Sequence, residues 1–150
     1  MENDNAGIRD RLDSLNGGPF ARCRARYEKL TDKFTSYFKN DVGVMLFSSP
    51  GRTELCGNHT DHNHGKVLAA SVELDVTAAV AGTDDGKIVV KSDLYPAIVV
   101  DSADVSLKSR ETGTSTALTR GVIAGLAERG RKTGGFNAYI HSNIPEGSGL

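Results

Sequence analysis

The densest polar chemistry in the chain lies in residues 51–65, a segment that begins and ends with glycine. It holds four side chains that donate or accept hydrogen bonds within a few positions of one another: Asn58, His59, Asp61 and Asn63. A carboxylate and amides can take paired hydrogen bonds from neighbouring hydroxyls, so the segment suits a polyhydroxylated ligand. Arg52 adds a fixed cation, which can stabilise negative charge on a transferring phosphoryl group.

Two other interpretations of this segment stay open. The side chains of His59, Asp61, His62 and His64 are of metal-ligand type, which is the basis of a hydrolase hypothesis. Their order, His-x-Asp-His-x-His, differs from that of known metal strips of this kind. The simplest alternative is a solvated loop in which the histidines have no special role.

A second candidate site is the glycine-rich segment Pro145–Leu150, which follows an apparent strand. Glycine lets a backbone approach a phosphate and present its N–H groups, and a helix beginning just after the loop adds its positive dipole end. The segment is neither a Walker A loop nor a dinucleotide GxGxxG motif, and alone it is equally consistent with an ordinary strand-to-helix turn. Because the chain ends where that helix is expected, we expect an incomplete portion of a longer protein.

The elements that must position these segments follow from hydrophobic periodicity. Apolar residues at helical spacing predict an amphipathic helix from Pro19 to about Lys39. Residues 44–47 predict a short strand that ends in the turn-forming cluster Ser48–Gly51. Residues 67–72 are consistent with a strand or a buried turn, and residues 74–80 are rich in β-formers.

The second half of the chain predicts further strands and one more helix. Thr83–Gly86 predicts a hairpin turn into a strand at 87–92, and residues 97–100 predict another strand. Thr116–Arg129 predicts a helix, and residues 136–142 a strand. The apolar stripe expected on that helix consists of Leu118, Val122, Ile123, Leu126 and Ala127. This order predicts an α+β fold rather than a regularly alternating one.

The amino-acid composition argues against several classes of function. The chain has 150 residues, 38% apolar and 25% charged residues and a net charge of -1, as expected for one globular domain. No basic run indicates a nucleic-acid partner, and no apolar stretch approaches the roughly 20 residues of a membrane span. No signal peptide is evident at the N-terminus, and Cys23 and Cys56 form no CxxC pair. We therefore expect a cytoplasmic protein with reduced thiols.

Three blocks of this sequence, taken together, resemble the galactokinase branch of the GHMP kinases (galactokinase, homoserine, mevalonate and phosphomevalonate kinases). Pro50–Asp61 is similar to the pattern PGRxNxxGEHxDY, and Gly65–Val72 to the GxVLPxAI that follows it. Arg120–Leu150 resembles the run into the phosphate motif PxGxGLSSSA.

The resemblance implies the family's N-terminal domain, with the topology of ribosomal protein S5 domain 2, cut before the phosphate-loop helix. Residues 1–40 would form an N-terminal helical segment, and residues 41–150 part of the kinase domain with its galactose-binding motif. The implied reaction uses Mg-ATP and galactose to form galactose 1-phosphate. The Mg²⁺ ligands and the catalytic base are expected beyond residue 150, so the chain alone is expected to be inactive.

The resemblance also implies roles for individual residues. Arg52 would lie beside the sugar and the γ-phosphate as a catalytic residue, and Ser92 would contact the adenosine side of ATP. The residues implied to bind the sugar are Asn58, His59, Thr60 and Asp61. Those implied to begin the ATP phosphate loop are Gly147, Ser148 and Gly149.

The chain departs from the family pattern at three positions of the first block. Asn58 stands where the family usually has Glu, Glu54 where it usually has Asn, and His62 where it usually has Tyr. These changes leave the identity of the sugar open. The alternatives are a sugar-binding sensor without kinase activity, and a kinase of the same superfamily that acts on another sugar or a small alcohol.

Overall fold

The computed structural model describes residues 19–58 and 60–149, so His59, Leu150 and the start of the predicted N-terminal helical segment lie outside the described residues. Within these residues, two helices, α2 (Pro19–Phe38) and α3 (Ser115–Glu128), accompany the strands of one sheet. The strands are β1 (Met45–Cys56), β2 (Leu68–Thr83), β3 (Lys87–Ser92), β4 (Ile98–Asp101) and β5 (Gly135–Ser142). Two short 3-10 helices are η1 (Asp61–Asn63) and η2 (Ser109–Glu111). The predicted α+β class is confirmed, whereas the division at residue 40 stays a prediction.

The five-stranded sheet has the order β1-β2-β5-β3-β4. The last strand, β5, therefore lies at its centre, antiparallel to β2 and parallel to β3. The hairpin predicted at Thr83–Gly86 is wrong, because β2 and β3 do not pair with each other. The turn itself forms, with Gly86 at a positive φ of 70°, but β5 lies between the two strands that the turn connects. A local turn signal cannot reveal a strand that arrives from about 50 residues later in the chain.

Gly135 begins β5 inside the mouth of this turn. A Cβ atom at this position would lie 2.6 Å from Thr83 Oγ1, 2.9 Å from Gly86 N and 3.0 Å from Lys87 N. Since two of these atoms belong to the backbone, the turn leaves room only for glycine here.

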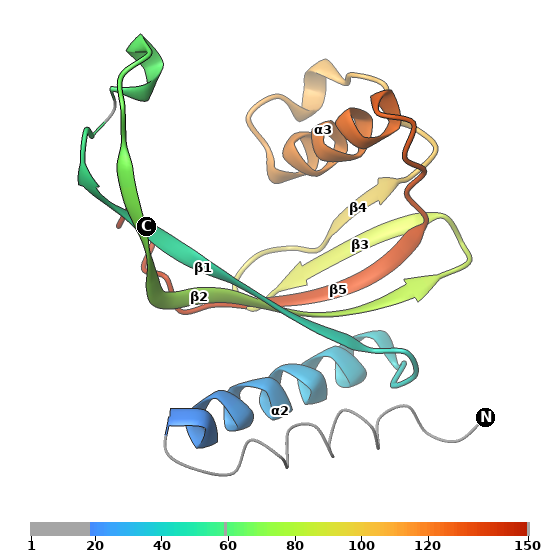
Figure 1. Ribbon diagram of the computed structural model, residues 1–150. Coiled ribbons are helices and arrows are strands. Elements are labelled where there is room, and N and C mark those ends of the chain that lie inside the picture. Colours follow the sequence, from blue (N-terminus) through green and yellow to red (C-terminus); the bar gives the residue numbers. More distant parts are fainter. Residues whose placement is uncertain (1–18, 59, 150) are drawn as a thin grey trace.

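The two helices cover opposite faces of the sheet (Figure 1). On one face, Leu30 and Phe34 of α2 are buried in a cluster with Val44, Ala79, Ala81 and Tyr139. On the other face, Ile123 of α3 packs with Ile88 and Val100 of β3 and β4. Alternate residues of β5 reach both clusters, since Tyr139 belongs to the first and Phe136 packs against the second.

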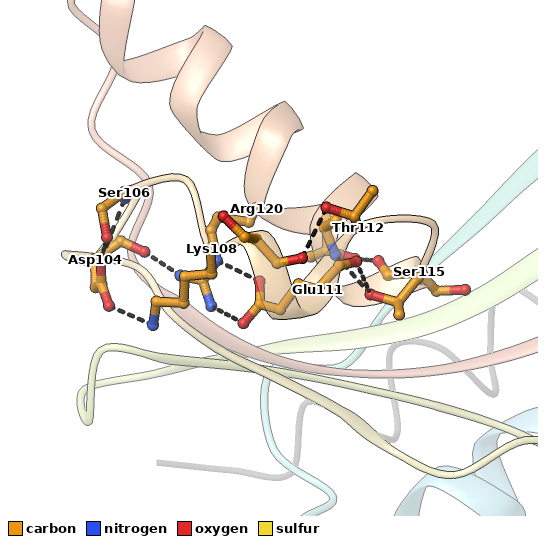
Figure 2. A network of polar contacts seen from close by, with 11 residues as sticks. Asp104, Ser106, Lys108, Glu111, Thr112, Ser115 and Arg120 are labelled. Carbon is orange, nitrogen blue, oxygen red and sulfur yellow. Dashed lines mark hydrogen bonds and ion pairs between the residues drawn. The ribbon is translucent and has the colours of Figure 1, made fainter.

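The stripe predicted for α3 is buried only at Ile123, and Leu118 and Val122 are largely exposed. Arg120, only 6% exposed, contributes more to fixing this helix. Its guanidinium donates two hydrogen bonds to the Glu111 carboxylate, at 2.8 and 3.0 Å, and a third to the carbonyl of Asp104 (Figure 2). A polar clamp therefore joins α3 to the segment that precedes it.

The β1–β2 ribbon is longer than the rest of the sheet. Strand β5 pairs with β2 only from Val76 onward, so residues 50–75 form a two-stranded arm that projects from the sheet (Figure 1). The turn predicted at Ser48–Gly51 is wrong, because β1 continues through it with a register shift between Pro50 and Arg52. Proline is tolerated here because β1 is an edge strand.

Neither α2 nor α3 is both long and apolar enough to cross a membrane, within the part of the chain that the structure describes.

The fit at Gly135 gives a test of the sheet topology. Gly135→Ala is expected to lower the free energy of unfolding by about 1 to 3 kcal/mol, because the added methyl group overlaps the turn backbone. Gly134→Ala is the matched control: its Cβ would meet nothing within 4 Å. The control is expected to stay within about 0.5 kcal/mol of the parent in urea unfolding. Equal effects of the two variants would contradict the placement of β5 in the turn mouth.

Candidate functional site

A pocket of about 440 Å³ lies where the arm leaves the sheet. One wall is the β1 segment Ser49–Arg52, and the floor includes Val76 of β2. Ile144 and Gly149, from the loop that follows β5, form the other wall. The structure thus brings together two segments that the sequence singled out separately, the start of the polar motif and the glycine loop (residues 143–149). The volume falls in the range of small-ligand sites.

Arg52 is the predicted catalytic residue that lines this pocket. Its side chain is 72% exposed, and its Nη2 atom donates to Glu54 Oε1 at 3.3 Å. The two residues lie two positions apart on one strand, so their side chains share a face. The other carboxylate oxygen, Glu54 Oε2, is buried and has no hydrogen-bond partner among the described residues. The guanidinium is therefore held by one hydrogen bond to Glu54, and the rest of the Arg52 side chain, which lines the pocket, is largely exposed.

Three of the predicted sugar-binding residues, Asn58, Thr60 and Asp61, follow the end of β1 and lie in the tip loop (residues 57–58 and 60–67) at the far end of the arm. Asn58 is exposed there, Asp61 begins η1, and His59 lies outside the described residues. The structure does not bring Asn58 or Thr60 to the walls of the pocket. Cys56, where the tip begins, is four strand residues beyond Arg52, or about 13 Å along β1.

Thr60 closes the tip loop. Its hydroxyl lies within donating distance of the carbonyls of Gly57 and Lys66, at 2.8 and 3.1 Å. Its own carbonyl accepts the Gly65 amide at 2.8 Å. A Cβ at Gly57 would lie 2.2 Å from Lys66 O, and one at Gly65 would lie 2.6 Å from Thr60 Cβ. The glycines of the motif are thus required by the tight closure of the loop around Thr60.

The glycine loop has the backbone freedom expected of a phosphate cradle. Gly147 and Gly149 take positive φ angles of 73° and 75°, which favour glycine. The Ser148 amide donates to the carbonyl of Pro145 at 3.2 Å, which closes a turn between them. Ser92 ends β3 beside Ile140 of β5, near the start of this loop, but does not line the pocket.

Asp75 joins the elements around the pocket and was not singled out from the sequence. Its carboxylate accepts hydrogen bonds from Arg26 of α2 at 2.5 Å and from Ser48 of β1 at 2.7 Å. Burial alone would raise the pKa of Asp75, but the hydrogen bonds from Ser48 and Arg26 outweigh it and hold this pKa below its ordinary value. The sequence did contain a signal for this residue, because Asp75 is an acidic residue within an otherwise largely apolar run.

Asp93 forms a second junction between α2 and the sheet. It accepts hydrogen bonds from Lys33 at 2.6 Å and Tyr139 at 2.9 Å, and it contacts His141 Nδ1 at 2.7 Å. Burial opposes ionisation, yet these donors together lower the pKa of Asp93 to about 2. None of its three partners lines the pocket.

Residues 19–58 and 60–149 contain no group of three His, Cys, Asp or Glu side chains close enough to hold a metal ion. The donor set near the pocket, one carboxylate beside one arginine, also does not fit Mg²⁺, which prefers several oxygen ligands and waters. The described residues near the pocket therefore do not form a Mg²⁺ site by themselves.

Comparison with known proteins identifies the class of protein to which the chain is similar. The galactokinase galactose-binding signature matches residues 32–82. The galactokinase of Lactococcus lactis, solved in complex with galactose, superposes with a TM-score of 0.75 and 34% identity over 83% of this chain. The mevalonate kinase of Methanococcus jannaschii superposes with a TM-score of 0.57 and 18% identity over 74% of this chain and 36% of its own.

These likenesses give the chain the fold of the GHMP kinases. Within that superfamily, the chain belongs to the galactokinase family, as the resemblance of its three sequence blocks predicted. It spans 32% of the length of the lactococcal galactokinase.

The two carboxylate junctions make the fold sensitive to acid. The pKa values of Asp75 and Asp93 lie below the pKa of an aspartate in the unfolded chain. At a pH between the folded and the unfolded pKa values, the unfolded state binds more protons, so the free energy of unfolding falls as the pH falls. We expect the free energy of unfolding to drop from about pH 5 to about pH 2. Asp93→Asn should make the drop smaller, and Tyr139→Phe, which removes one donor, should give an intermediate profile. Urea unfolding at a series of pH values measures this; parallel profiles for all three proteins would contradict it.

Proposed function

We propose that the protein is a galactokinase that transfers the γ-phosphate of ATP to the anomeric hydroxyl of galactose. The observation that carries this proposal is the shared pocket of Arg52 and Gly149, which unites the cation of the sugar motif with the glycine loop. The match to the galactose-binding signature supports the sugar, and the kinase relatives support ATP. Because the chain spans a third of its lactococcal relative, the activity is proposed for the protein made from the complete reading frame.

In this mechanism Arg52 stabilises the negative charge that develops as the γ-phosphoryl group leaves ADP and bonds to the sugar oxygen. Its guanidinium can act because the Arg52 side chain lines the pocket and is 72% exposed. Gly147 and Gly149 hold the ATP phosphates through their backbone N–H groups, with Ser148 between them in the same loop, and Ser92 contacts the adenosine side. The sugar proton passes to a base outside the residues described. Magnesium, when bound with ATP, supplies further charge neutralisation.

Asn58, His59, Thr60 and Asp61 hold the hydroxyls of the sugar in this proposal. The tip loop begins after Cys56, about 13 Å along β1 from Arg52, so the arm must bend to bring these residues to the pocket. The register shifts at Pro50/Arg52 and at Glu54/Cys56 give β1 two irregular points at which bending is least costly. Free thiols at Cys23 and Cys56 support a cytoplasmic location.

A coupled assay of ADP formation tests the proposal on the protein made from the complete reading frame. Arg52→Ala is expected to lower kcat/KM for galactose by about 100-fold or more, because the cation at the phosphoryl group is lost. The variant also loses the ion pair with Glu54, whose side chain is only 15% exposed, so its activity is measured well below its own unfolding transition. Arg110→Ala, at an exposed arginine of η2, is the control and should retain activity. Phosphate transfer to mevalonate or homoserine but to no sugar would overturn the proposed substrate.

The alternative function is a sugar-binding sensor without kinase activity. The observation that favours it is the separation of the tip loop from the pocket, together with the neutral Asn58 at the position where the family usually has Glu. Calorimetry with galactose and with nucleotide, on the protein made from the complete reading frame, distinguishes the two functions. The 150-residue chain alone is expected to bind galactose without forming ADP. Galactose affinity of the complete protein with no nucleotide affinity would instead establish the sensor.

A further inference from the structure

Asp75 lies at the point where the arm leaves the sheet. It is the last β2 residue before the part that pairs with β5, which begins at Val76. It also stands opposite Pro50, the last β1 residue before the register shift. The side chain points to the face covered by α2, whereas the pocket lies on the other face, with Val76 in its floor. Asp75 is thus directly behind the floor of the pocket.

Both walls of the pocket are attached to this residue. Toward the β1 wall, the Asp75 carboxylate accepts the hydroxyl of Ser48, the neighbour of Ser49. Toward the glycine-loop wall, the Asp75 amide donates to Asn143 Oδ1 at 2.7 Å, and the Asp75 carbonyl accepts the Asn143 amide at 3.2 Å. Asn143 immediately precedes Ile144, which lines the pocket.

The attachment is rigid for a physical reason. Asp75 is only 8% exposed, and a buried carboxylate requires hydrogen-bond partners to offset the loss of its hydration. Arg26 provides a charged partner at 2.5 Å, and Ser48 provides a neutral one. Losing either donor would leave a buried charge under-satisfied, so the donors and the elements that carry them are held in place.

We propose that Asp75 is a positioning residue that sets the distance between Arg52 and the glycine loop, and that Arg26 extends this control to helix α2. This inference rests on the proposed kinase function. Phosphoryl transfer depends on the placement of the reacting groups, and a displacement of about 1 Å can cost about 100-fold in rate. Asp75 touches no reacting atom; it acts through Ser48 and Asn143.

Asp75→Asn tests the proposal in the protein made from the complete reading frame. We expect kcat/KM for galactose phosphorylation to fall by about 10- to 100-fold. Asn143→Ala should cause a loss of similar size, and the double variant should lose little more than either single one, because both changes act on one junction. Ser48→Ala should impair the reaction, and Ser48→Thr, which keeps the hydroxyl, should restore it.

Glu111→Gln is the control for a purely structural role. It weakens the other buried arginine–carboxylate pair, which lies beside α3 and away from the pocket. It should lower the melting temperature yet leave kcat/KM within about twofold of the parent well below the transition. If Asp75→Asn and Asn143→Ala behave like Glu111→Gln, the positioning role is overturned.

Hydrogen exchange separates this proposal from the proposed function. If the parent protein phosphorylates no sugar, the function fails, and the positioning role is then decided by exchange at the amides within residues 49–52 and 144–149. Faster exchange in both segments for Asp75→Asn, but not for Glu111→Gln, supports the role of Asp75. Unchanged exchange in these segments overturns it whatever the enzyme activity.

Discussion

The structure depends on strand β5, which is the last strand in the sequence and lies in the middle of the sheet. It pairs antiparallel with β2 and parallel with β3, so the β1–β2 half and the β3–β4 half are joined through it. Each half carries its own helix and its own core cluster, on opposite faces. Alternation along β5 sends Tyr139 to one cluster and packs Phe136 against the other. Without this strand the two cores would have no shared element, which makes the fold strongly non-local.

The same strand determines where the glycine loop lies. Because β5 runs antiparallel to β2, its end at Ser142 pairs with Val76, at the base of the arm. Asn143 then binds the backbone of Asp75, and the loop continues along the wall of the pocket. The sheet topology and the position of the candidate site are therefore consequences of one pairing. Arg52 comes to the pocket from β1, on the side opposite the glycine loop. The register shift of β1 between Pro50 and Arg52 lies next to the point where β5 ends.

Local patterns in the sequence predicted the local elements well. The bounds predicted for α2, β3, α3 and β5 agree with the structure to within about one residue, because periodicity and breakers act over a few residues. The hairpin at Thr83–Gly86 and the turn at Ser48–Gly51 were wrong because each depends on distant strands. The buried role of Arg120 was missed, because it depends on Glu111 and on the carbonyl of Asp104, which the fold brings to it. Asp75 carried a signal, a charge within an apolar strand, but its partners come from three other segments.

Compared with the usual family pattern, this chain has a carboxylate at position 54 (Glu54) and a neutral amide at position 58 (Asn58). This difference changes the electrostatics around Arg52. A carboxylate at Glu54 lies on the strand beside Arg52 and accepts its guanidinium, whereas Asn58 leaves the tip without the negative charge that the family usually has there. The ion pair does not disable Arg52, because the Arg52 side chain is 72% exposed and solvent ions screen its charge. A phosphate in the pocket, with a larger charge, can compete for the guanidinium. Glu54 therefore orients Arg52 through a single hydrogen bond, since its Oε2 atom has no hydrogen-bond partner within the described residues.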